Sequence, residues 1–473
     1  MRSHEAGALH SAAGSRAPVW LRQPDDVNLL VPRLWARNVV RGPDGVVSVA
    51  GVSVVTLARE FGTPAYVIDE DDFRSRAREF RAAFDGAFAD LCGGADVFYA
   101  GKAFHTVAST RWLMDEGMSL DVCTGGELAV ALRAGFPPER MGMHGNNKSE
   151  AELARALDAG VGRIVVDSAQ EIARLARLAA ARGVRAPVMV RLTVGVEAHT
   201  HEYIATAHED QKFGFSLAGR AAADAVGAVL AEPSLRLIGL HSHIGSQSFD
   251  TAAFEVAARR TVELHTQVRD EHGVELPELD LGGGFGIAYT SQDDPQTPDQ
   301  LATSLAEIVG QECRAQGVTV PRISVEPGRA IAGPSTFTLY EVGTVKVVEL
   351  DAGASRNYVA VDGGMSDNIR AALYDADYSC TLANRRSDAE PVLARVVGKH
   401  CESGDIVVKD EFLPADVEPG DLIAVPGTGA YARSLANTYN HVPRAPVVAV
   451  RDGKARVIVR RETEEDLLRL DVP

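Results

Sequence analysis

Lys102 is a lysine whose neighbours suit covalent chemistry on a carbonyl group. It lies in the segment Tyr99–Phe104, which reads YAGKAF. Apolar surroundings would desolvate its ammonium group and lower its pKa, and the neutral amine is the form that attacks an aldehyde. The residue types therefore point to a Schiff base. Taken alone, the segment is equally compatible with an ordinary surface lysine just beyond a strand.

A second candidate is the carboxylate of Glu326, in the sequence Glu326-Pro327-Gly328-Arg329. It ends a predicted buried strand, where an unpaired charge is costly, so it requires a cationic partner. A protonated pyridine nitrogen would satisfy this carboxylate, and the ion pair would keep the ring an effective electron sink. The alternative is a structural ion pair between Glu326 and Arg329.

The run Gly282–Gly286, which reads GGGFG and includes Gly283 and Gly284, leaves several backbone amides unobstructed by side chains. Such amides can approach an anion such as phosphate. The run comes late in the chain and lacks the spacing of a dinucleotide-binding motif. A tight strand-to-loop turn without a ligand is the other reading.

His241 and His243 bracket Ser242 on a predicted strand, and Ser246 follows at its end. Strand alternation points both imidazoles to one face, so we expect one of them to enter the site and stack on an aromatic cofactor. They could also be metal ligands, but no third ligand lies nearby in the sequence, which disfavours zinc. We therefore predict no metal.

These residues need a scaffold, and short apolar runs alternate with helical stretches from about Asp69 to Pro334. This pattern predicts a closed (β/α)8 barrel of the TIM type, in which strand C-termini converge on one mouth. Lys102 and Gly282 follow predicted strands, and Glu326 ends one. The eight strands are expected at Val97–Ala100, Ser119–Cys123, Arg140–His144, Arg163–Asp167, Val188–Leu192, Leu237–Ile244, Glu278–Leu281 and Arg322–Glu326.

Helix and turn signals complete the expected architecture. Apolar residues on one stripe predict a helix over Asp71–Phe88 before the first strand. Serine N-caps predict the starts of two later helices, Ser149–Ala159 and Ser168–Arg182. β-rich runs after Pro334 predict a mainly antiparallel β domain, and an Asp452-Gly453 pair predicts a hairpin. We expect domains at 69–334 and 335–473, with residues 21–68 packing on the second domain and residues 1–20 flexible.

Bulk properties bound the function. The chain has 473 residues, enough for two domains, and a formal net charge of −17 that disfavours nucleic acid and anionic membranes as partners. Its beginning lacks the apolar segment of a signal peptide or membrane anchor. Cysteines are odd in number and widely spaced, so we expect no disulfide framework and a cytoplasmic location. They are Cys92, Cys123, Cys313, Cys380 and Cys401.

Taken together, these segments resemble the alanine-racemase-like barrel decarboxylases, a family dependent on pyridoxal 5'-phosphate (PLP) that includes ornithine and diaminopimelate decarboxylases. The resemblance is closest to the diaminopimelate branch and covers most of the chain. The matching segments are Val97–Phe104, His144–Ser149, Asp210–Phe215, Gly239–Gln247, Leu281–Ile287, Glu326–Arg329, Asp362–Tyr374, His400–Asp405 and Gly427–Tyr431.

The resemblance implies a role for each matching residue. Lys102 carries the cofactor, His243 stacks on the pyridine and Glu326 pairs with its nitrogen. Phosphate lies against Ser246 and the glycines. Asp121, Glu127 and Arg191 match polar residues that surround the active site of the ornithine decarboxylases. The cofactor-binding set is Lys102, His243, Ser246, Gly283, Gly284, Glu326, Gly328, Arg329 and Tyr431, and the catalytic pair is Lys102 and Cys401.

For the substrate, the resemblance implies meso-2,6-diaminopimelate, which loses CO2 to give L-lysine in the last step of lysine biosynthesis. A distal carboxylate and ammonium need a cation and an acceptor. The implied substrate-binding residues are Arg329, Arg370, Tyr374, Glu402 and Tyr431. Ile369 replaces a frequent proline before Arg370. The Cys401-Glu402 segment of such enzymes reaches the neighbouring subunit, which implies a homodimer with shared active sites.

Two alternatives stay open from sequence. One is a decarboxylase of another basic amino acid, ornithine or arginine. The other is a non-catalytic regulatory relative that has lost cofactor chemistry, although Lys102, Glu326 and Cys401 are all present. A racemase is disfavoured, because racemase relatives have a shorter β domain and a different base arrangement.

Overall fold

The computed structural model describes residues 17–195, 212–249, 251–350 and 355–472. These residues form two compact units. The barrel unit consists of Arg74–Gly286 and Pro295–Ala330, and the β unit consists of the chain up to Phe73, Ile287–Asp294 and Ile331–Pro473. Most of the predicted flexible segment 1–20, and the first two residues of the matching segment Asp210–Phe215, lie outside the described residues.

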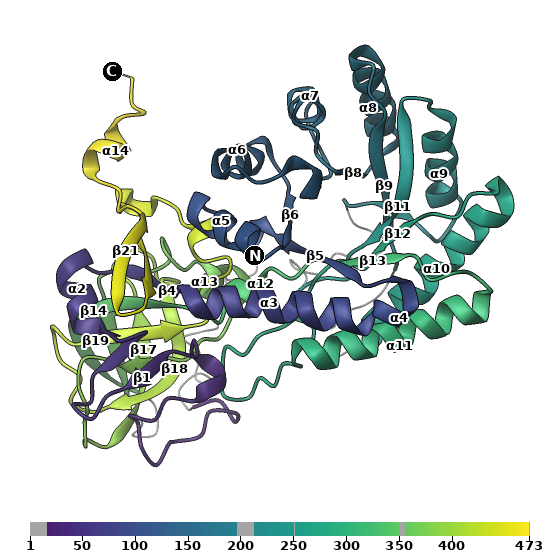
Figure 1. The fold of residues 1–473 in the computed structure, drawn as a ribbon. Coiled ribbons are helices and arrows are strands. Elements are labelled where there is room, and N and C mark those ends of the chain that lie inside the picture. Colours follow the sequence, from purple (N-terminus) through teal and green to yellow (C-terminus); the bar gives the residue numbers. More distant parts are fainter. Residues whose placement is uncertain (1–16, 196–211, 250, 351–354, 473) are drawn as a thin grey trace. The chain divides into compact units, whose positions relative to one another are not determined.

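Eight parallel strands of the barrel unit close on themselves, which confirms the predicted barrel (Figure 1). Each strand pairs with its neighbours, and β8 pairs with β9 to complete the circle. The predicted strands agree with the observed ones to within two residues at most ends. The strands in barrel order are β5 Ala95–Ala100, β6 Ser119–Val122, β7 Met141–Met143, β8 Arg163–Val166, β9 Ala186–Thr193, β11 Leu235–Ser242, β12 Glu278–Asp280 and β13 Arg322–Val325.

One short strand described in the barrel unit was not predicted. β10, Phe215–Ser216, adds to β9 in parallel, with Phe215 opposite Leu192. Two residues are too few to produce a recognisable apolar alternation, so no pattern in the sequence separates this strand from a loop.

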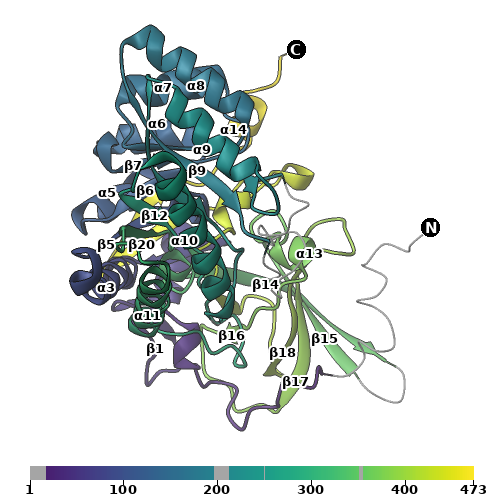
Figure 2. The ribbon, with the colours of Figure 1, turned by 90° about the vertical axis from the view of Figure 1, so that its right-hand side faces the viewer.

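Helices cover the outside of the barrel strands (Figure 2). The helix predicted over 71–88 is α3, and its stripe residues Ala77, Phe80 and Phe84 are buried. Serine N-caps at Ser149 and Ser168 begin two others, as predicted. The helices are α3 Glu70–Ala87, α4 Ala89–Cys92, α5 Val107–Asp115, α6 Gly125–Ala134, α7 Glu150–Ala159, α8 Ala169–Arg182, α9 Ala221–Ala231, α10 Ala252–His272, α11 Pro298–Gln316 and the short α12 Arg329–Ala332.

The β unit is mainly antiparallel, as predicted, with two parallel pairs, β15 with β17 and β4 with β20. Asp452 and Gly453 have φ values of 50° and 71° and form the predicted hairpin turn. The strands are β1 Val39–Arg41, β2 Val47–Val49, β3 Val52–Ser53, β4 Ala65–Asp69, β14 Thr336–Glu349, β15 Ser355–Val361, β16 Thr381–Leu382, β17 Pro391–Val397, β18 Ile406–Pro414, β19 Leu422–Pro426, β20 Val447–Arg451 and β21 Lys454–Val459; the helices are α2 Val54–Phe61, α13 Arg370–Tyr374 and α14 Glu464–Leu468.

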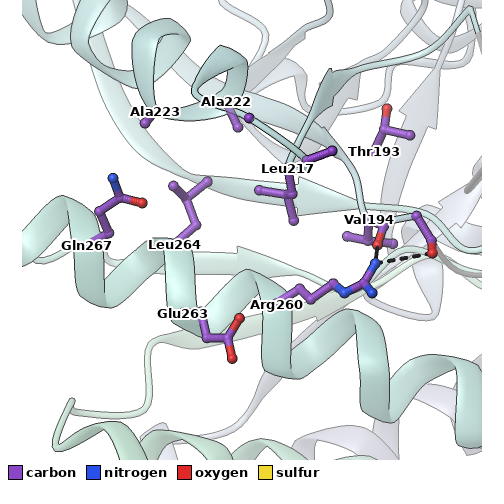
Figure 3. A pocket seen from close by; sticks show the side chains of 12 residues that line it. Thr193, Val194, Leu217, Ala222, Ala223, Arg260, Glu263, Leu264 and Gln267 are labelled. Atoms are coloured by element: carbon purple, nitrogen blue, oxygen red, sulfur yellow. Dashed lines mark hydrogen bonds between the residues drawn. The ribbon is translucent and has the colours of Figure 1, made fainter. Parts of the chain in front are cut away.

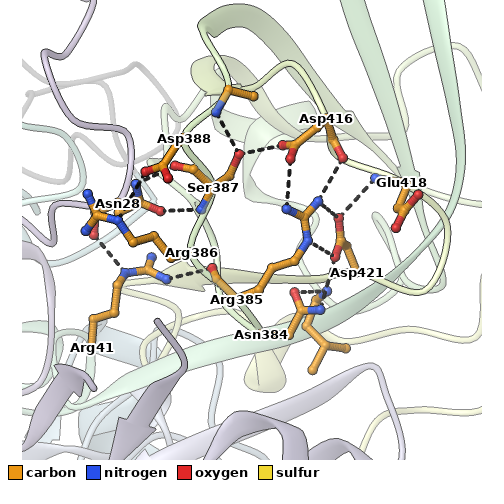
Figure 4. Close-up of polar contacts among 12 residues, drawn as sticks. Asn28, Arg41, Asn384, Arg385, Arg386, Ser387, Asp388, Asp416, Glu418 and Asp421 are labelled. Atoms are coloured by element: carbon orange, nitrogen blue, oxygen red, sulfur yellow. Dashed lines mark hydrogen bonds and ion pairs between the residues drawn. The ribbon is translucent and has the colours of Figure 1, made fainter. Parts of the chain in front are cut away.

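Polar contacts fasten the N-terminal segment within the β unit (Figure 4). The Arg41 guanidinium donates to the carbonyl oxygens of Asn28 and Leu382, at 2.8 Å each. The Asn28 side chain exchanges two hydrogen bonds with the backbone of Ser387. Beneath these contacts, Val47 and Val49 pack in one apolar core with residues of β14, β19 and β20. The early chain is therefore an integral layer of this unit.

None of the described helices has the length and apolar character that crossing a lipid bilayer requires.

Candidate active site

The ends of the barrel strands surround a cavity of about 360 Å³. Lys102, His243 and Glu326, predicted from three different strands, all line it, and so does His241. This is the convergence that a closed parallel barrel imposes on residues following its strands. The remaining lining residues are Ala100, Gly101, Asp121, Cys123, Thr124, His144, Gly145, Asn146, Asn147, Glu152, Arg191 and Phe213.

The structure does not show the apolar environment that the sequence predicts for the Lys102 amine. The side chain lies in a short 3-10 turn, Gly101–Ala103, whose other two residues are buried, but Lys102 itself is exposed at the cavity. The apolar residues next to Lys102 in the sequence are buried in the turn, but they do not surround its amine. Desolvation by the protein alone therefore does not explain a reactive Lys102, although its position in the cavity is the one that the chemistry needs.

Glu326 is a buried carboxylate flanked by two imidazoles. Its Oε1 lies 3.0 Å from His241 Nε2 and 3.5 Å from His144 Nε2. Burial opposes ionisation, yet the two adjacent imidazoles hold the pKa of Glu326 well below its usual range. Among the described residues, no Lys or Arg nitrogen lies within 4.0 Å of this carboxylate. Glu326 is therefore a buried anion that can accept a cationic ring nitrogen.

A buried network of charged side chains adjoins Glu326. The Arg163 guanidinium lies 2.5 Å from Asp280 and donates to Ser324 Oγ at 2.9 Å. Asp121 Oδ1 lies 2.9 Å from His144 Nε2, and burial together with the charge of Glu326 raises the pKa of Asp121 well above its usual value. Asp280 pairs with Arg163 and the pKa of Asp121 is raised, so Glu326 is the carboxylate of this group whose pKa is held low.

His243 lines the cavity as a neutral ring. Burial and the nearby Lys102 lower its pKa well below 6.5, and its Nδ1 accepts the Gly283 N–H at 3.1 Å. The neutral imidazole therefore carries its proton on Nε2. A neutral ring fixed in this way presents a face for stacking on an aromatic cofactor. Both histidines of the pair enter the cavity, where the sequence argument required only one.

The glycines form a cradle that no side chain could enter. A Cβ on Gly283 would lie 2.2 Å from the Glu326 carbonyl oxygen, and one on Gly284 would lie 2.6 Å from the Gly245 carbonyl oxygen. Gly284 has φ of +113°, a conformation that favours glycine. This cradle fits the close approach of a phosphate group to backbone amides, so the residues of this unit suit pyridoxal phosphate.

Arg329 does not pair with Glu326, which removes the alternative of a structural ion pair between them. Its guanidinium donates instead to Ser246 Oγ, at 2.8 Å from Nη2 and 3.3 Å from Nε. Gly328 allows the chain to pass Ala100, because a Cβ there would lie 2.9 Å from the Ala100 carbonyl oxygen. Ser246 and Arg329, two residues expected near the phosphate, are thus direct neighbours.

The expected substrate-binding residues of the β unit lie in three segments. Arg370 and Tyr374 begin and end α13, and Arg370 is buried. Cys401 and Glu402 are exposed on a loop, and the Cys401 N–H donates to Asn440 Oδ1 at 3.1 Å. Tyr431 has φ of 61°, a left-handed backbone conformation that residues other than glycine rarely adopt.

A second cavity, of about 370 Å³, lies in the barrel unit beside the end of β9 (Figure 3). The Arg260 side chain is its main cation, but the guanidinium is bonded to the carbonyl oxygens of Val194 and Gly195. Glu263 and Gln267 complete the polar lining from the same helix. Its described lining residues include no lysine or histidine, whereas the first cavity contains Lys102, His243 and Glu326, so we place the catalytic centre in the first cavity.

Sequence reasoning did not assign roles to His144, Arg163 or Asp280. His144 follows β7 directly and lies in the matching segment His144–Ser149, so the strand-end rule selects it, but the sequence does not show which side chains its ring contacts. His144, His241 and Glu326 bring three possible metal-ligand atoms within 4.8 Å of one another. We assign this group to the cofactor, because the two histidines already bond to Asp121 and Glu326 and because Lys102 and His243 share the cavity.

Comparisons with known proteins show the family to which this chain belongs. The family model described as pyridoxal-dependent decarboxylase, pyridoxal binding domain, matches residues 70–333. Diaminopimelate decarboxylase of Mycobacterium tuberculosis (strain H37Rv) is 58% identical over 447 residues, covering 94% of this chain and 98% of that protein. The Bacillus subtilis (strain 168) enzyme of that name is 46% identical over 429 residues, covering 91% and 96%.

Solved structures give the same result. The diaminopimelate decarboxylase of M. jannaschii in co-complex with L-lysine superposes with a TM-score of 0.86 at 30% identity, over 93% of this chain and 98% of that one. Neither an ornithine or arginine decarboxylase nor a non-catalytic relative is favoured by these likenesses. The chain therefore belongs to the diaminopimelate decarboxylases, within the pyridoxal-dependent decarboxylase family.

Proposed function

We propose that this protein removes one carboxylate of meso-2,6-diaminopimelate to give L-lysine and CO2, with pyridoxal phosphate held in the barrel cavity. The observation that carries the proposal is that Lys102, His243 and Glu326 line one cavity. An amine, a stacking ring and a buried carboxylate are the three groups that this cofactor requires. The homology of the whole chain to diaminopimelate decarboxylases supports the substrate.

In this proposal Lys102 Nζ holds the cofactor aldehyde and Glu326 holds a proton at the pyridine nitrogen. When bound, pyridoxal phosphate supplies an electron sink for the pair of electrons left by departing CO2. His243 presents its neutral ring to one face of the pyridine. Gly283 and Gly284 in the cradle, with Gly328, Ser246 and Arg329 close by, bind the phosphate, assisted by Tyr431.

The β unit supplies substrate recognition. Arg370 binds the carboxylate that the product keeps, with Arg329, Tyr374 and Tyr431 as further contacts, and Glu402 accepts the distal ammonium group. In support, Arg370 is a buried guanidinium that has no acidic partner within 4.0 Å among the described residues. The Cys401 thiol donates a proton to the α-carbon after CO2 has left.

We further propose that the active form is a homodimer in which Cys401 and Glu402 serve the partner's site, and that it resides in the cytoplasm. Both residues are exposed in the isolated chain, and all five cysteines are unpaired thiols. Mixing inactive Lys102→Ala and Cys401→Ala subunits tests the shared site. Subunit exchange should restore up to about a quarter of the parent activity, because half of the dimers then contain one intact site. If each subunit has a self-contained site, mixing restores nothing.

The decisive test of substrate is CO2 release measured with meso-diaminopimelate, L-ornithine and L-arginine in parallel, with L-lysine identified as the product of the first. We expect kcat/KM for meso-diaminopimelate to exceed the others by at least about 1,000-fold, because an arginine left without its carboxylate partner penalises the other substrates. Preference for ornithine or arginine would refute the proposal.

A further inference from the structure

Arg370 is a buried cation with no acidic partner in the described part of the chain. The residue is 5% exposed, and none of the described Asp and Glu side chains has an oxygen within 4.0 Å of its guanidinium. Its Nε is buried and has no hydrogen-bond partner among the described residues. A buried guanidinium in this state is costly unless an anionic ligand completes its surroundings. Something other than an acid must keep it in place before that ligand arrives.

Tyrosine side chains hold the Arg370 guanidinium in place. The Arg370 Nη1 donates to the Tyr378 hydroxyl at 2.7 Å. The guanidinium carbon lies 4.8 Å from the ring centroid of Tyr289, and 5.7 Å and 6.0 Å from those of Tyr378 and Tyr374. Ring faces attract a cation without neutralising it, so the guanidinium keeps its full charge for an incoming carboxylate.

These two inner rings are themselves fixed. Tyr289 and Tyr378 are 6% and 1% exposed and meet edge to face, with centroids 5.1 Å apart. The Ser379 N–H donates to the Tyr289 carbonyl oxygen at 3.1 Å, and the Tyr289 N–H donates to Asp293 Oδ2 at 2.9 Å. Gly427 packs against the Tyr289 ring. A Cβ at this position would lie 3.2 Å from the ring, so a glycine leaves the space that the ring needs.

We propose that Tyr378 and Tyr289 are positioning residues that orient the charged Arg370 guanidinium and thereby determine specificity for substrates with a distal carboxylate. The inference rests on the proposed role of Arg370 in binding that carboxylate. Tyr378 fixes the guanidinium plane through a charge-assisted hydrogen bond, and Tyr289 supports one face of it. Tyr374 stays a substrate contact and does not belong to this pair.

L-Lysine and cadaverine provide a clean test, because they differ by a single carboxylate, the one assigned to Arg370. Their affinities for the PLP-loaded enzyme are measured by calorimetry. Tyr378→Phe should weaken L-lysine binding about tenfold, the typical cost of losing a hydrogen bond to a charged group, and leave cadaverine binding unchanged. Equal losses for both ligands, or unchanged affinity for L-lysine, would overturn the inference.

A second variant covers the case in which Tyr378→Phe does not fold. Tyr289→Leu removes the supporting ring face and should give the same selective loss. Tyr358→Phe is the matched control, because Tyr358 faces another arginine of the β unit, Arg395, at 5.8 Å. It should change neither affinity, and a selective loss of L-lysine binding in this variant would contradict the assignment to Tyr378.

Arg370→Ala distinguishes the substrate role of Arg370 from the positioning role of the two tyrosines. If this variant still binds L-lysine with parent affinity, the proposed substrate role of Arg370 is wrong, and the inference fails with it. If Arg370→Ala loses L-lysine selectively while both tyrosine variants retain it, the substrate role stands and only the positioning role of Tyr378 and Tyr289 is rejected.

Discussion

His241 Nε2 lies 3.0 Å from Glu326 Oε1, and both side chains are buried at the ends of different barrel strands. This bond, together with His144 at 3.5 Å, fixes the carboxylate and favours its ionised form. A fixed, ionised acid is what a protonated pyridine nitrogen needs as a partner.

Replacing Glu326 by Gln keeps the shape and removes the charge. Because the amide cannot hold a proton at the pyridine nitrogen, we expect kcat to fall at least about 100-fold while the cofactor stays bound through Lys102. Steady-state CO2 release and the cofactor absorbance spectrum measure the two effects. Glu411→Gln, a change at a half-buried glutamate of the β unit, is the control and should retain parent kcat. Parent-like kcat in Glu326→Gln would refute the ion pair.

His105 should make the protein less stable in mild acid. Burial lowers its pKa from 6.5 to about 4, and neither ring nitrogen has a hydrogen-bond partner among the described residues. The unfolded chain therefore binds this proton below its ordinary pKa while the folded chain does not, so stability falls as the pH drops from 6.5 toward 4. Between pH 7 and pH 5 the loss is about 2 kcal/mol.

Denaturant unfolding at the two pH values measures this loss, at constant protein and PLP concentration. In His105→Phe the difference in unfolding free energy between pH 7 and pH 5 should shrink by about that amount, because the ring no longer titrates. An unchanged difference would mean that His105 does not contribute to the acid sensitivity.

Gly283→Ala should damage the phosphate cradle. Its Cβ would lie 2.2 Å from the Glu326 carbonyl oxygen, so the backbone must shift. We expect a loss of about 2 kcal/mol in stability and a weaker PLP affinity, measured by unfolding and by cofactor titration. Gly86→Ala is the matched control, since nothing lies within 4 Å of the added Cβ and alanine favours the helix. Parent-like PLP affinity in Gly283→Ala would contradict the cradle.

The sequence predicts the barrel well because its signals are local. Alternation of strands and helices located all eight strands, and serine caps located the starts of α7 and α8. Strand ends then selected Lys102, His243 and Glu326, since a closed parallel barrel brings these ends to one mouth. Local pattern and topology together were sufficient for that part of the site.

The remaining features depend on contacts between distant segments. The partners of Glu326 were not predictable, because His144, His241 and Arg329 are all within reach of a strand end and sequence does not rank them. Exposure of Lys102 was missed because its apolar neighbours pack beneath it. Tyr289 was missed because it lies 81 positions before Arg370 in the sequence. Tyr378 is only eight positions from Arg370, but no repeating pattern marks their contact.

Lys102→Ala tests the central claim most directly, with the absorbance spectrum of the PLP-loaded protein and CO2 release from meso-diaminopimelate measured on the same sample. The account predicts loss of the absorbance band of the lysine-bound cofactor together with loss of turnover by at least about 1,000-fold. A variant that keeps both the band and the turnover would show that another amine holds the cofactor, and it would contradict the assignment of this cavity.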